Sequence, residues 1–349
     1  MDFEFSIKIK LKRNFKTIRC EKHMNEDQIG SKIVQSLGKT DIQITPIGQG
    51  VMNLASGSRI FKFMFPPISD EESNSIIQTA YNNGINWYDT AEAYGFGRSE
   101  RRLSAGLQAA NIKDEDVVIA TKWMPMMRWA GSIKKTIGKR IKNLHPYTID
   151  LHQIHFPYSF SSLKSQLNTM ADLVDDGKIR AVGVSNFSAK QMRKAHEVLE
   201  QRGLPLASNQ VNYSLVNRKI ESNGILDTAK ELGMTIICWS PLQRGVLTGK
   251  YHNDPDSLKK VPIGRRRSIK RKIEKSQKLI DDLSLIAQNN GVTISQVALN
   301  WLVKYHNETV VVIPGASKAS QAEQNGQTMN FNLSQNELNS IAELSEQFI

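Results

Sequence analysis

Cysteine is scarce in this chain, which contains only Cys20 and Cys238 among its 349 residues. The two residues give neither a disulfide framework nor the paired spacing of a metal site, so no bound metal is predicted. Long apolar stretches are lacking as well, since no run approaches the roughly 20 residues that a helix needs to cross a bilayer. These absences predict a cytoplasmic protein without a membrane span.

A glycine-rich nucleotide-binding turn is also lacking. An open doubly wound sheet normally carries three spaced glycines directly after its first strand. Here the GQG of residues 48–50 is followed by VMNL without a third glycine at that spacing, and the GFG of residues 95–97 does not directly follow a strand. Both segments are interpreted as ordinary turns, which disfavours the open sheet.

Acidic residues are absent from residues 5–20 and nearly absent from residues 259–275, where Glu274 is the only one. The whole chain has a formal net charge of +12. Such a segment is either solvated surface or a site for an anionic ligand, and both interpretations stay open for residues 259–275. Nucleic-acid binding is not predicted, because no stacking platform or recognised motif accompanies the charge.

Eight short runs rich in β-branched residues alternate with helical patterns. Most are too apolar to alternate cleanly, as is typical of strands covered on both faces. Gly84, Gly177 and Gly233 stand where a helix ends before a strand, which is typical of βα units. The runs are residues 47–52, 85–89, 117–122, 149–155, 179–185, 207–210, 234–240 and 310–314. They predict an α/β fold with a (β/α)₈ TIM barrel.

The helices between these runs are amphipathic. Ile133, Ile137, Ile141 and Leu144 are spaced by three or four residues and predict one apolar helix face. Ser69 and Glu72 predict a capping box at the start of another helix.

The N-terminal basic segment is too charged for the apolar core of a signal peptide. It is interpreted as an extension, either a surface arm or an extra strand, or as sequence upstream of an alternative start at Met24. The chain is therefore divided into a basic extension, residues 1–38, and one barrel domain, residues 39–349.

Four residues competent in acid–base chemistry fall at one end of the predicted barrel. Asp89, Lys122 and His155 end the second, third and fourth strands, and Tyr94 lies in the loop after Asp89. Active sites of such barrels are built at the C-terminal ends of the strands. These four residues are therefore the candidate catalytic site.

Their side chains suit the donation of a proton to a carbonyl oxygen. The reference pKa of tyrosine is about 10, and a nearby lysine ammonium is expected to lower it. Aspartate would hold the lysine, and histidine would donate a hydrogen bond to the carbonyl. Metal binding by His152 and His155 is rejected, because residues three apart on a strand point to opposite faces.

The chain resembles the aldo-keto reductase superfamily from about Asp41 to about Ser345. The resemblance rests on GINWYDTAEAYGFGRSE (84–100), ATK (120–122), IDLHQIHFP (149–157), VGVSNFS (182–188), NQVNYS (209–214), CWSPLQRGVLTGKY (238–251) and IPGASKASQAEQN (313–325). The set looks closer to bacterial and plant-type reductases, and to potassium-channel β-subunits, than to the aldose-reductase branch. The resemblance implies an NADPH-dependent oxidoreductase that reduces aldehydes and ketones, with Asp89, Lys122 and His155 completing a catalytic tetrad around the proton donor Tyr94.

The resemblance also implies a set of residues that bind NADP(H). Ser185, Asn186 and Gln210 match residues that hold the nicotinamide amide, and Trp239 matches the aromatic residue that stacks on the nicotinamide. Ser240, Leu242 and Arg244 fall in the loop that covers the pyrophosphate. The phosphate and adenosine end comprises Gly315, Ser317, Lys318, Gln321, Gln324 and Asn325, with one of Arg265, Arg266 and Arg267 expected on the 2′-phosphate.

Two loops depart from the compact family pattern. Residues 53–68 are long, and residues 123–131 are rich in methionine and tryptophan. In one interpretation they shape an apolar pocket for a small carbonyl substrate. In the other, Phe61, Phe63 and Phe65 form a packed hairpin or an oligomer contact, and the oligomeric state stays open.

An alternative function is that of the channel β-subunits, which use this barrel as a nucleotide-responsive partner of a membrane protein. Those subunits usually lack the histidine that stands here at position 155. The presence of His155 therefore favours an enzyme.

Overall fold

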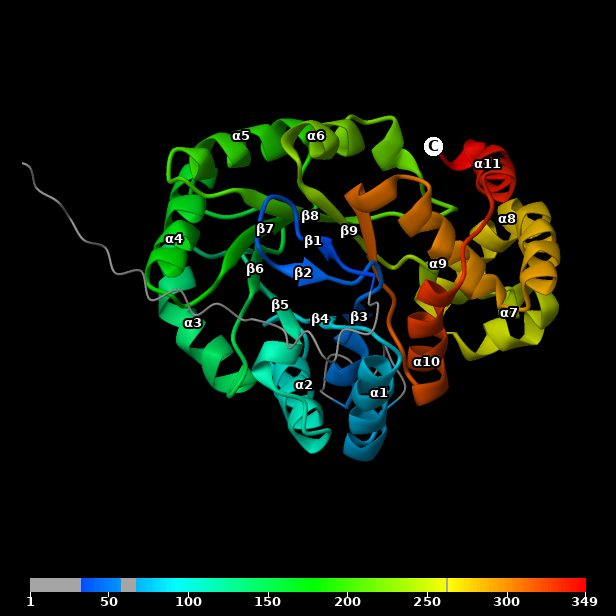
Figure 1. Ribbon diagram of the computed structural model, residues 1–349, viewed down its shortest axis with the longest axis horizontal. Coiled ribbons are helices and arrows are strands. Elements are labelled where there is room, and N and C mark those ends of the chain that lie inside the picture. The colour runs from blue at the N-terminus through cyan, green and yellow to red at the C-terminus, as the bar shows by residue number, and fades with distance from the viewer. Residues whose placement is uncertain (1–32, 58–66, 262) are drawn as a thin grey trace, which may run out of the picture.

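Eight parallel strands form a barrel with helices around its outside (Figure 1). The computed structural model describes residues 33–57, 67–261 and 263–349. The strands lie side by side in chain order: β3 (Gln49–Gly50), β4 (Trp87–Asp89), β5 (Val118–Trp123), β6 (Leu151–Ile154), β7 (Ala181–Ser185), β8 (Leu206–Asn212), β9 (Thr235–Trp239) and β10 (Val310–Ile313).

The first and last strands close the barrel. Gly48 N donates to Val312 O at 2.8 Å, and Val312 N donates to Pro46 O at 3.0 Å. Gly50 also pairs with Gly315 just beyond β10. The predicted TIM barrel is confirmed, because an open sheet would leave these two strands unpaired.

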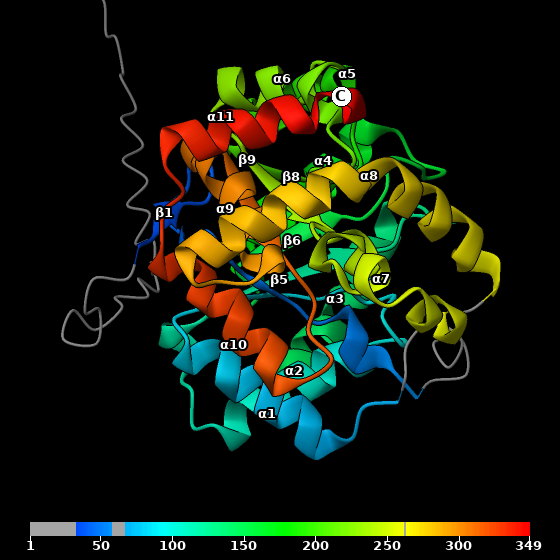
Figure 2. The same ribbon diagram turned by 90° about the vertical axis from the view of Figure 1, so that its right-hand side faces the viewer.

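Helices connect the strands and cover the barrel. They are α1 (Asp70–Asn82), α2 (Arg98–Ala109), α3 (Gly131–Leu144), α4 (Leu163–Asp175), α5 (Ala189–Glu200), α6 (Ile225–Leu232) and α9 (Ile294–Lys304), with α10 (Ala319–Gln327) after β10. Beyond this pattern stand α7 (Lys250–Asn253), α8 (Ile263–Asn290) and α11 (Gln335–Leu344); α8 packs against α9 and α11 (Figure 2). Among the described helices, none combines the length and apolar composition needed to span a bilayer.

A hairpin of β1 (Gln35–Ser36) and β2 (Gln43–Ile44) covers one end of the barrel (Figure 1). Its apolar residues Leu37, Ile42 and Ile44 pack with Trp87 inside the barrel. This hairpin is not evident from the sequence, because each strand has only two residues and shows no hydrophobic alternation. The basic segment before it and the three phenylalanines of the loop after β3 lie outside the described residues, and the division of the chain at residue 38 stays a prediction.

Strand alternation decides which side chains fill the barrel. On β5, Val118 and Ala120 belong to the buried apolar cluster that includes the hairpin. Lys122 follows at the next position of the same parity. Trp87 and Asp89 repeat this order on β4. The interior is therefore apolar towards the hairpin and polar towards the C-terminal strand ends.

The local signals at helix ends are confirmed. Ser69 and Glu72 form the predicted capping box at α1. Gly84, Gly177 and Gly233 have positive φ angles of 88°, 68° and 66°. Glycine adopts this left-handed conformation without the steric cost that a Cβ adds, so each helix can end and lead directly into the next strand.

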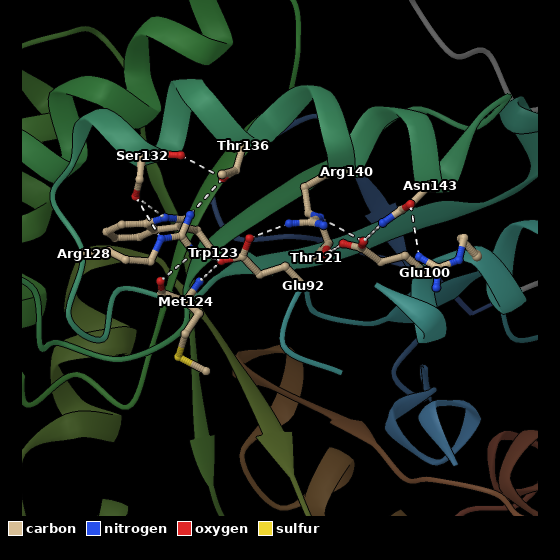
Figure 3. A network of polar contacts seen from close by, with 11 residues as sticks. Glu92, Glu100, Thr121, Trp123, Met124, Arg128, Ser132, Thr136, Arg140 and Asn143 are labelled. Atoms are coloured by element: carbon tan, nitrogen blue, oxygen red, sulfur yellow. Dashed lines mark hydrogen bonds and ion pairs between the residues drawn. The ribbon is translucent and has the colours of Figure 1, made fainter. Parts of the chain in front are cut away.

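One helix face differs from the prediction. Ile133 and Ile137 of α3 are buried, but Ile141 is 38% exposed whereas Arg140 is 3% exposed. A helix turns every 3.6 residues, so position 140 continues the inward face better than position 141. An arginine is accommodated there because the carboxylates of Glu92 and Glu100 accept hydrogen bonds from it (Figure 3).

Candidate active site

Asp89 and Lys122 form a buried ion pair at the C-terminal end of the barrel. Lys122 Nζ lies 2.5 Å from Asp89 Oδ1, and the two side chains are 0% and 3% exposed. Lys122 Nζ also donates to Thr90 O at 2.7 Å. The second carboxylate oxygen of Asp89 accepts from Gln210 Nε2 at 2.8 Å and from Gln153 Nε2 at 3.3 Å. A buried carboxylate held this way is both paired and hydrogen-bonded, as burial of charge requires.

Gln153 was not among the predicted site residues. It stands two positions before His155, so strand alternation turns both side chains to the interior. Gly183 leaves room for it, because a Cβ there would lie 3.0 Å from Gln153 Cγ and 2.6 Å from Ser208 Oγ. The parity of the strand was the signal that could have identified Gln153.

Tyr94 and His155 lie beside the ion pair. Lys122 Nζ is 5.1 Å from the centre of the Tyr94 ring. The rings of Tyr94 and His155 meet edge to face with centroids 5.8 Å apart, and Phe156 stacks on His155 at 4.7 Å. The structure thus brings the four predicted catalytic residues into one cluster.

Burial controls the ionisation of this cluster. Burial raises the pKa of Tyr94 above its usual value, and the opposing effect of the Lys122 ammonium does not overcome it. Burial alone would lower the pKa of Lys122, but the Asp89 carboxylate raises it above its usual value. Burial, with the positive charge of Lys122, lowers the pKa of His155 to about 3. At neutral pH the phenol is therefore protonated, the ammonium charged and the imidazole neutral.

The predicted nicotinamide residues lie on adjacent strand ends. Ser185 Oγ donates to Gln210 O at 2.8 Å, and Asn186 Nδ2 donates to Ser185 Oγ at 3.0 Å. Trp239 Nε1 donates to Asn186 Oδ1 at 3.2 Å. Asn186 Nδ2 also donates to His155 O at 3.1 Å, which joins this group to the tetrad.

A pocket of about 190 Å³ opens beside Trp239. It is lined by Asn212, Trp239, Ser240, Gln243, Arg244, Ile269 and Lys272. Burial and the charge of Arg244 lower the pKa of Lys272, whose Nζ donates to Gln243 Oε1. In the described part of the chain, neither cation is paired with a carboxylate, which favours an anionic ligand. Leu242, predicted in the same loop, is partly buried and packs against the core.

Two pocket residues, Asn212 and Lys272, were not predicted from the sequence. Asn212 holds Trp239 O at 3.1 Å, but the predicted strand ended at residue 210 whereas β8 continues to Asn212. Lys272 lies on α8, a helix of 28 residues. The sequence does not reveal which side of this helix faces the barrel.

The predicted phosphate and adenosine residues begin α10. Lys318 is the N-cap residue of α10 and is exposed, while Ser317 N donates to Gln321 Oε1 at 2.7 Å. Asn325 is 4% exposed, and its Nδ2 has no hydrogen-bond partner within the described residues. Gln324 is exposed one position earlier. An orphaned buried amide and an exposed cation together fit a polar, anionic ligand.

The three candidate arginines differ in what they contact. Arg266 Nη2 donates to Lys259 O at 2.7 Å and to Val261 O at 3.1 Å. Arg266 therefore holds the segment before α8 in this structure. Arg267 is exposed, and the side chain of Arg265 lies outside the described side chains.

Comparison with known proteins identifies the family to which this chain is similar. The aldo/keto reductase family model matches residues 46–346. Pyridoxal reductase, chloroplastic, of Arabidopsis thaliana is 32% identical over 309 residues, which cover 85% of this chain and 82% of that protein. An aldo-keto reductase of Schizosaccharomyces pombe, whose name specifies NADP(+), is 27% identical over 314 residues, with coverage of 86% and 88%. The structure of a glycerol dehydrogenase from Gluconobacter oxydans superposes with a TM-score of 0.75 at 27% identity, covering 92% of this chain and 97% of that one.

A barrel with an ionisable cluster at its C-terminal strand ends has the arrangement of an enzyme of this fold class. The family match covers most of the chain. The chain belongs to the aldo/keto reductase family and is an oxidoreductase that acts on carbonyl compounds.

Proposed function

We propose that this enzyme reduces aldehydes or ketones to alcohols with NADPH, and that Tyr94 donates the proton. The observation that carries the proposal is the buried Asp89–Lys122 pair, with Tyr94 and His155 packed beside it. The four side chains come from three consecutive strand ends and the loop after the first of them, where this fold builds its active sites.

Each side chain has one task in this mechanism. When bound, the reduced nicotinamide supplies the hydride. Tyr94 gives its proton to the carbonyl oxygen as negative charge develops there, and Lys122 stabilises the phenolate that remains. Asp89 keeps Lys122 charged and in place. His155 is neutral because its pKa is about 3, so one ring nitrogen can donate a hydrogen bond to the same oxygen.

We propose NADP(H) as the cofactor. Arg244 and Lys272 place two cations beside Trp239, neither with a carboxylate partner among the residues that the structure describes, which suits the phosphates of a dinucleotide. Asn325 Nδ2, which has no partner within residues 33–57, 67–261 and 263–349, and the exposed Lys318 suit its adenosine phosphate end. The name of the Schizosaccharomyces pombe relative, which specifies NADP(+), supports this choice.

The test compares oxidation of NADPH and NADH with a panel of aliphatic, aromatic and sugar aldehydes. Pyridoxal and glyceraldehyde join the panel because relatives are named pyridoxal reductase and glycerol dehydrogenase. We expect carbonyl-dependent oxidation, faster with NADPH. If no carbonyl accelerates the oxidation of either nucleotide although NADPH binds, the protein is a nucleotide-responsive binding module instead.

We propose the cytoplasm as the compartment. Cys238 is a buried free thiol, which suits a reducing environment. The Arabidopsis thaliana relative is named as chloroplastic. Imaging of the full chain with a fluorescent protein at its C-terminus distinguishes the cytoplasm from an organelle.

A further inference from the structure

The backbone of the loop after β4 holds Tyr94 next to β5. Tyr94 N donates to Ala91 O at 3.0 Å, and Tyr94 O accepts from Ser99 N at 3.2 Å. Glu92 N, two positions before Tyr94, donates to Lys122 O at 3.2 Å. The placement of the phenol beside the Lys122 ammonium therefore depends on what fixes this loop against β5.

The turn that follows Tyr94 has an unusual backbone. Gly95, Phe96 and Gly97 all have positive φ angles, of 63°, 54° and 85°. The two glycines tolerate this left-handed conformation, but Phe96 keeps it only where its surroundings enforce it. A Cβ at Gly97 would lie 2.3 Å from Asn143 Nδ2, so α3 packs directly on the turn. The contacts that enforce the turn therefore include side chains from outside the loop.

The side chain of Glu92 ties the start of the loop to the end of β5. Its Oε1 accepts from Met124 N at 2.6 Å and from Arg128 Nη1, and its Oε2 accepts from Arg140 Nη1 (Figure 3). The Glu92 side chain is 9% exposed. A nearly buried carboxylate that accepts from two guanidinium groups and a backbone N–H is held in one place.

Glu100 ties the other end of the loop to the same strand. It lies in α2, is fully buried, and accepts from Thr121 Oγ1, Arg140 Nε and Asn143 Nδ2, each at 2.8 Å (Figure 3). Thr121 directly precedes Lys122 in β5, so the side chain of Thr121 points out of the barrel where that of Lys122 points in. Glu100 therefore holds the outer face of β5 directly behind Lys122.

One guanidinium group joins the two carboxylates. Arg140 donates through Nη1 to Glu92 and through Nε to Glu100, and its side chain is 4% exposed. We call these three residues the carboxylate clamp. It ties residues two before and six after Tyr94 to residues one before and two after Lys122. The clamp therefore fixes the positions of the phenol and the ammonium relative to each other.

The charges around the clamp are balanced. Arg128, which lies over the Trp123 ring at 5.4 Å, supplies a second cation to Glu92. Two carboxylates thus meet two guanidinium groups. Burial and the charge of Arg140 lower the pKa of His152 to about 3, so this neighbouring imidazole is neutral and leaves the balance unchanged. A buried network whose charged members are paired and hydrogen-bonded is rigid.

We propose that the carboxylate clamp consists of positioning residues for proton transfer, which hold the Tyr94 hydroxyl where it can reach the carbonyl oxygen while Lys122 stabilises the phenolate. This rests on the proposed reductase function. Misplacement of a reacting group by about 1 Å can lower a rate by about 10²-fold. Damage to the clamp therefore lowers kcat through the proton donor and leaves the binding of substrate and cofactor nearly unchanged.

The test measures kcat and KM of Glu92→Gln and Arg140→Lys with saturating NADPH and the aldehyde that the wild type reduces fastest. Glu92→Gln keeps the size of the side chain and removes its charge. Arg140→Lys keeps the charge, but one ammonium cannot replace two separated guanidinium nitrogens. We expect each variant to lower kcat about tenfold, with KM and the dissociation constant of NADP⁺ within about twofold of wild type. The double variant should lower kcat little further, because both side chains act through one contact.

The same substitutions in Tyr94→Phe separate positioning from general damage. In that background no hydroxyl remains to be positioned. Glu92→Gln, which should lower kcat about tenfold when Tyr94 is present, should therefore lower the residual rate of Tyr94→Phe by less than about twofold. A purely structural role of the clamp would lower both rates by the same factor.

Arg218→Lys is the matched control for Arg140→Lys. Arg218 is 3% exposed and donates from Nε and Nη2 to both oxygens of Glu221, and from Nη1 to Ala342 O. Its contacts join the loop after β8 to α11 and do not involve the loop of Tyr94. Arg218→Lys should lower the urea midpoint about as much as Arg140→Lys does, and it should leave kcat within about twofold of wild type.

The possible failures are distinguishable. Equal rate losses in the two backgrounds, or an unchanged kcat in both Glu92→Gln and Arg140→Lys, would overturn the role of the clamp while the reductase function stands. If those two variants fail to fold, Arg128→Lys tests the same carboxylate from a side chain that is 26% exposed. It should lower kcat about threefold when Tyr94 is present and not in Tyr94→Phe, and equal losses there would likewise overturn the proposal. Absence of turnover by the wild type with every carbonyl would overturn the reductase function itself.

Discussion

Removal of Lys122 should destabilise the protein more than removal of both members of its ion pair. In Lys122→Met, the Asp89 carboxylate keeps its hydrogen bonds from Gln210 and Gln153 but loses its cation. Breaking a buried ion pair from one side costs about 3–5 kcal/mol. The two remaining amide donors place the expected loss near the lower end, at about 3 kcal/mol at pH 7.

The double variant Asp89→Asn/Lys122→Met leaves no buried charge. We expect it to be more stable than Lys122→Met alone, and its loss to be smaller than the sum of the single losses by about 1–3 kcal/mol. Urea denaturation at pH 7 of the wild type, the two single variants and the double variant measures this coupling. Lys142→Met, at an exposed position of α3, is the control and should change stability by less than about 0.5 kcal/mol. Additivity of the two single losses within about 0.5 kcal/mol would refute the reasoning.

Two further predictions concern groups outside the ion pair. Burial and the nearby Arg140 lower the pKa of His152 to about 3, against about 6.5 when unfolded, so the unfolded chain binds the extra proton and stability falls as pH drops from 6.5 towards 3. At pH 5 the loss in the free energy of unfolding amounts to about 2 kcal/mol. Urea denaturation at pH 7 and at pH 5 measures it, and we expect the difference between the two pH values to shrink by this amount in His152→Leu. His145→Gln, at an exposed site, is the control and should leave the difference unchanged. Lys272→Gln should weaken NADP⁺ binding about tenfold and reduce the salt dependence of that binding, because a cation that contacts the pocket is lost. Titration followed by tryptophan fluorescence measures both effects. An equal effect of Lys275→Gln, at an exposed neighbouring position on α8, would contradict a specific role for Lys272.

The barrel could be predicted from sequence because each βα unit carries its own local signals. Runs of β-branched residues and the glycines at 84, 177 and 233 mark strand and helix ends independently of the rest of the chain. The ionisable cluster could be predicted for the same reason, since a parallel barrel brings all its strand ends to one rim.

The parts that could not be predicted depend on distant partners. Arg140 is buried because Glu92 and Glu100, which lie 48 and 40 residues earlier, reach it, and no pattern within α3 indicates this. Burial raises the pKa of Tyr94, whereas the presence of Lys122 in the sequence suggested that its pKa would be lowered. The extent of that burial depends on the folded structure and cannot be inferred from the sequence. Lys272 reaches the pocket only through the docking of α8.

The role of Tyr94 as proton donor is the central claim, and one substitution tests it directly. Tyr94→Phe keeps the ring that packs against His155 and removes only the hydroxyl. We predict that kcat/KM for aldehyde reduction falls by about 10²-fold or more, the scale of general acid catalysis, while the dissociation constant of NADPH stays within about twofold. Reduction at the wild-type rate by Tyr94→Phe would contradict the account.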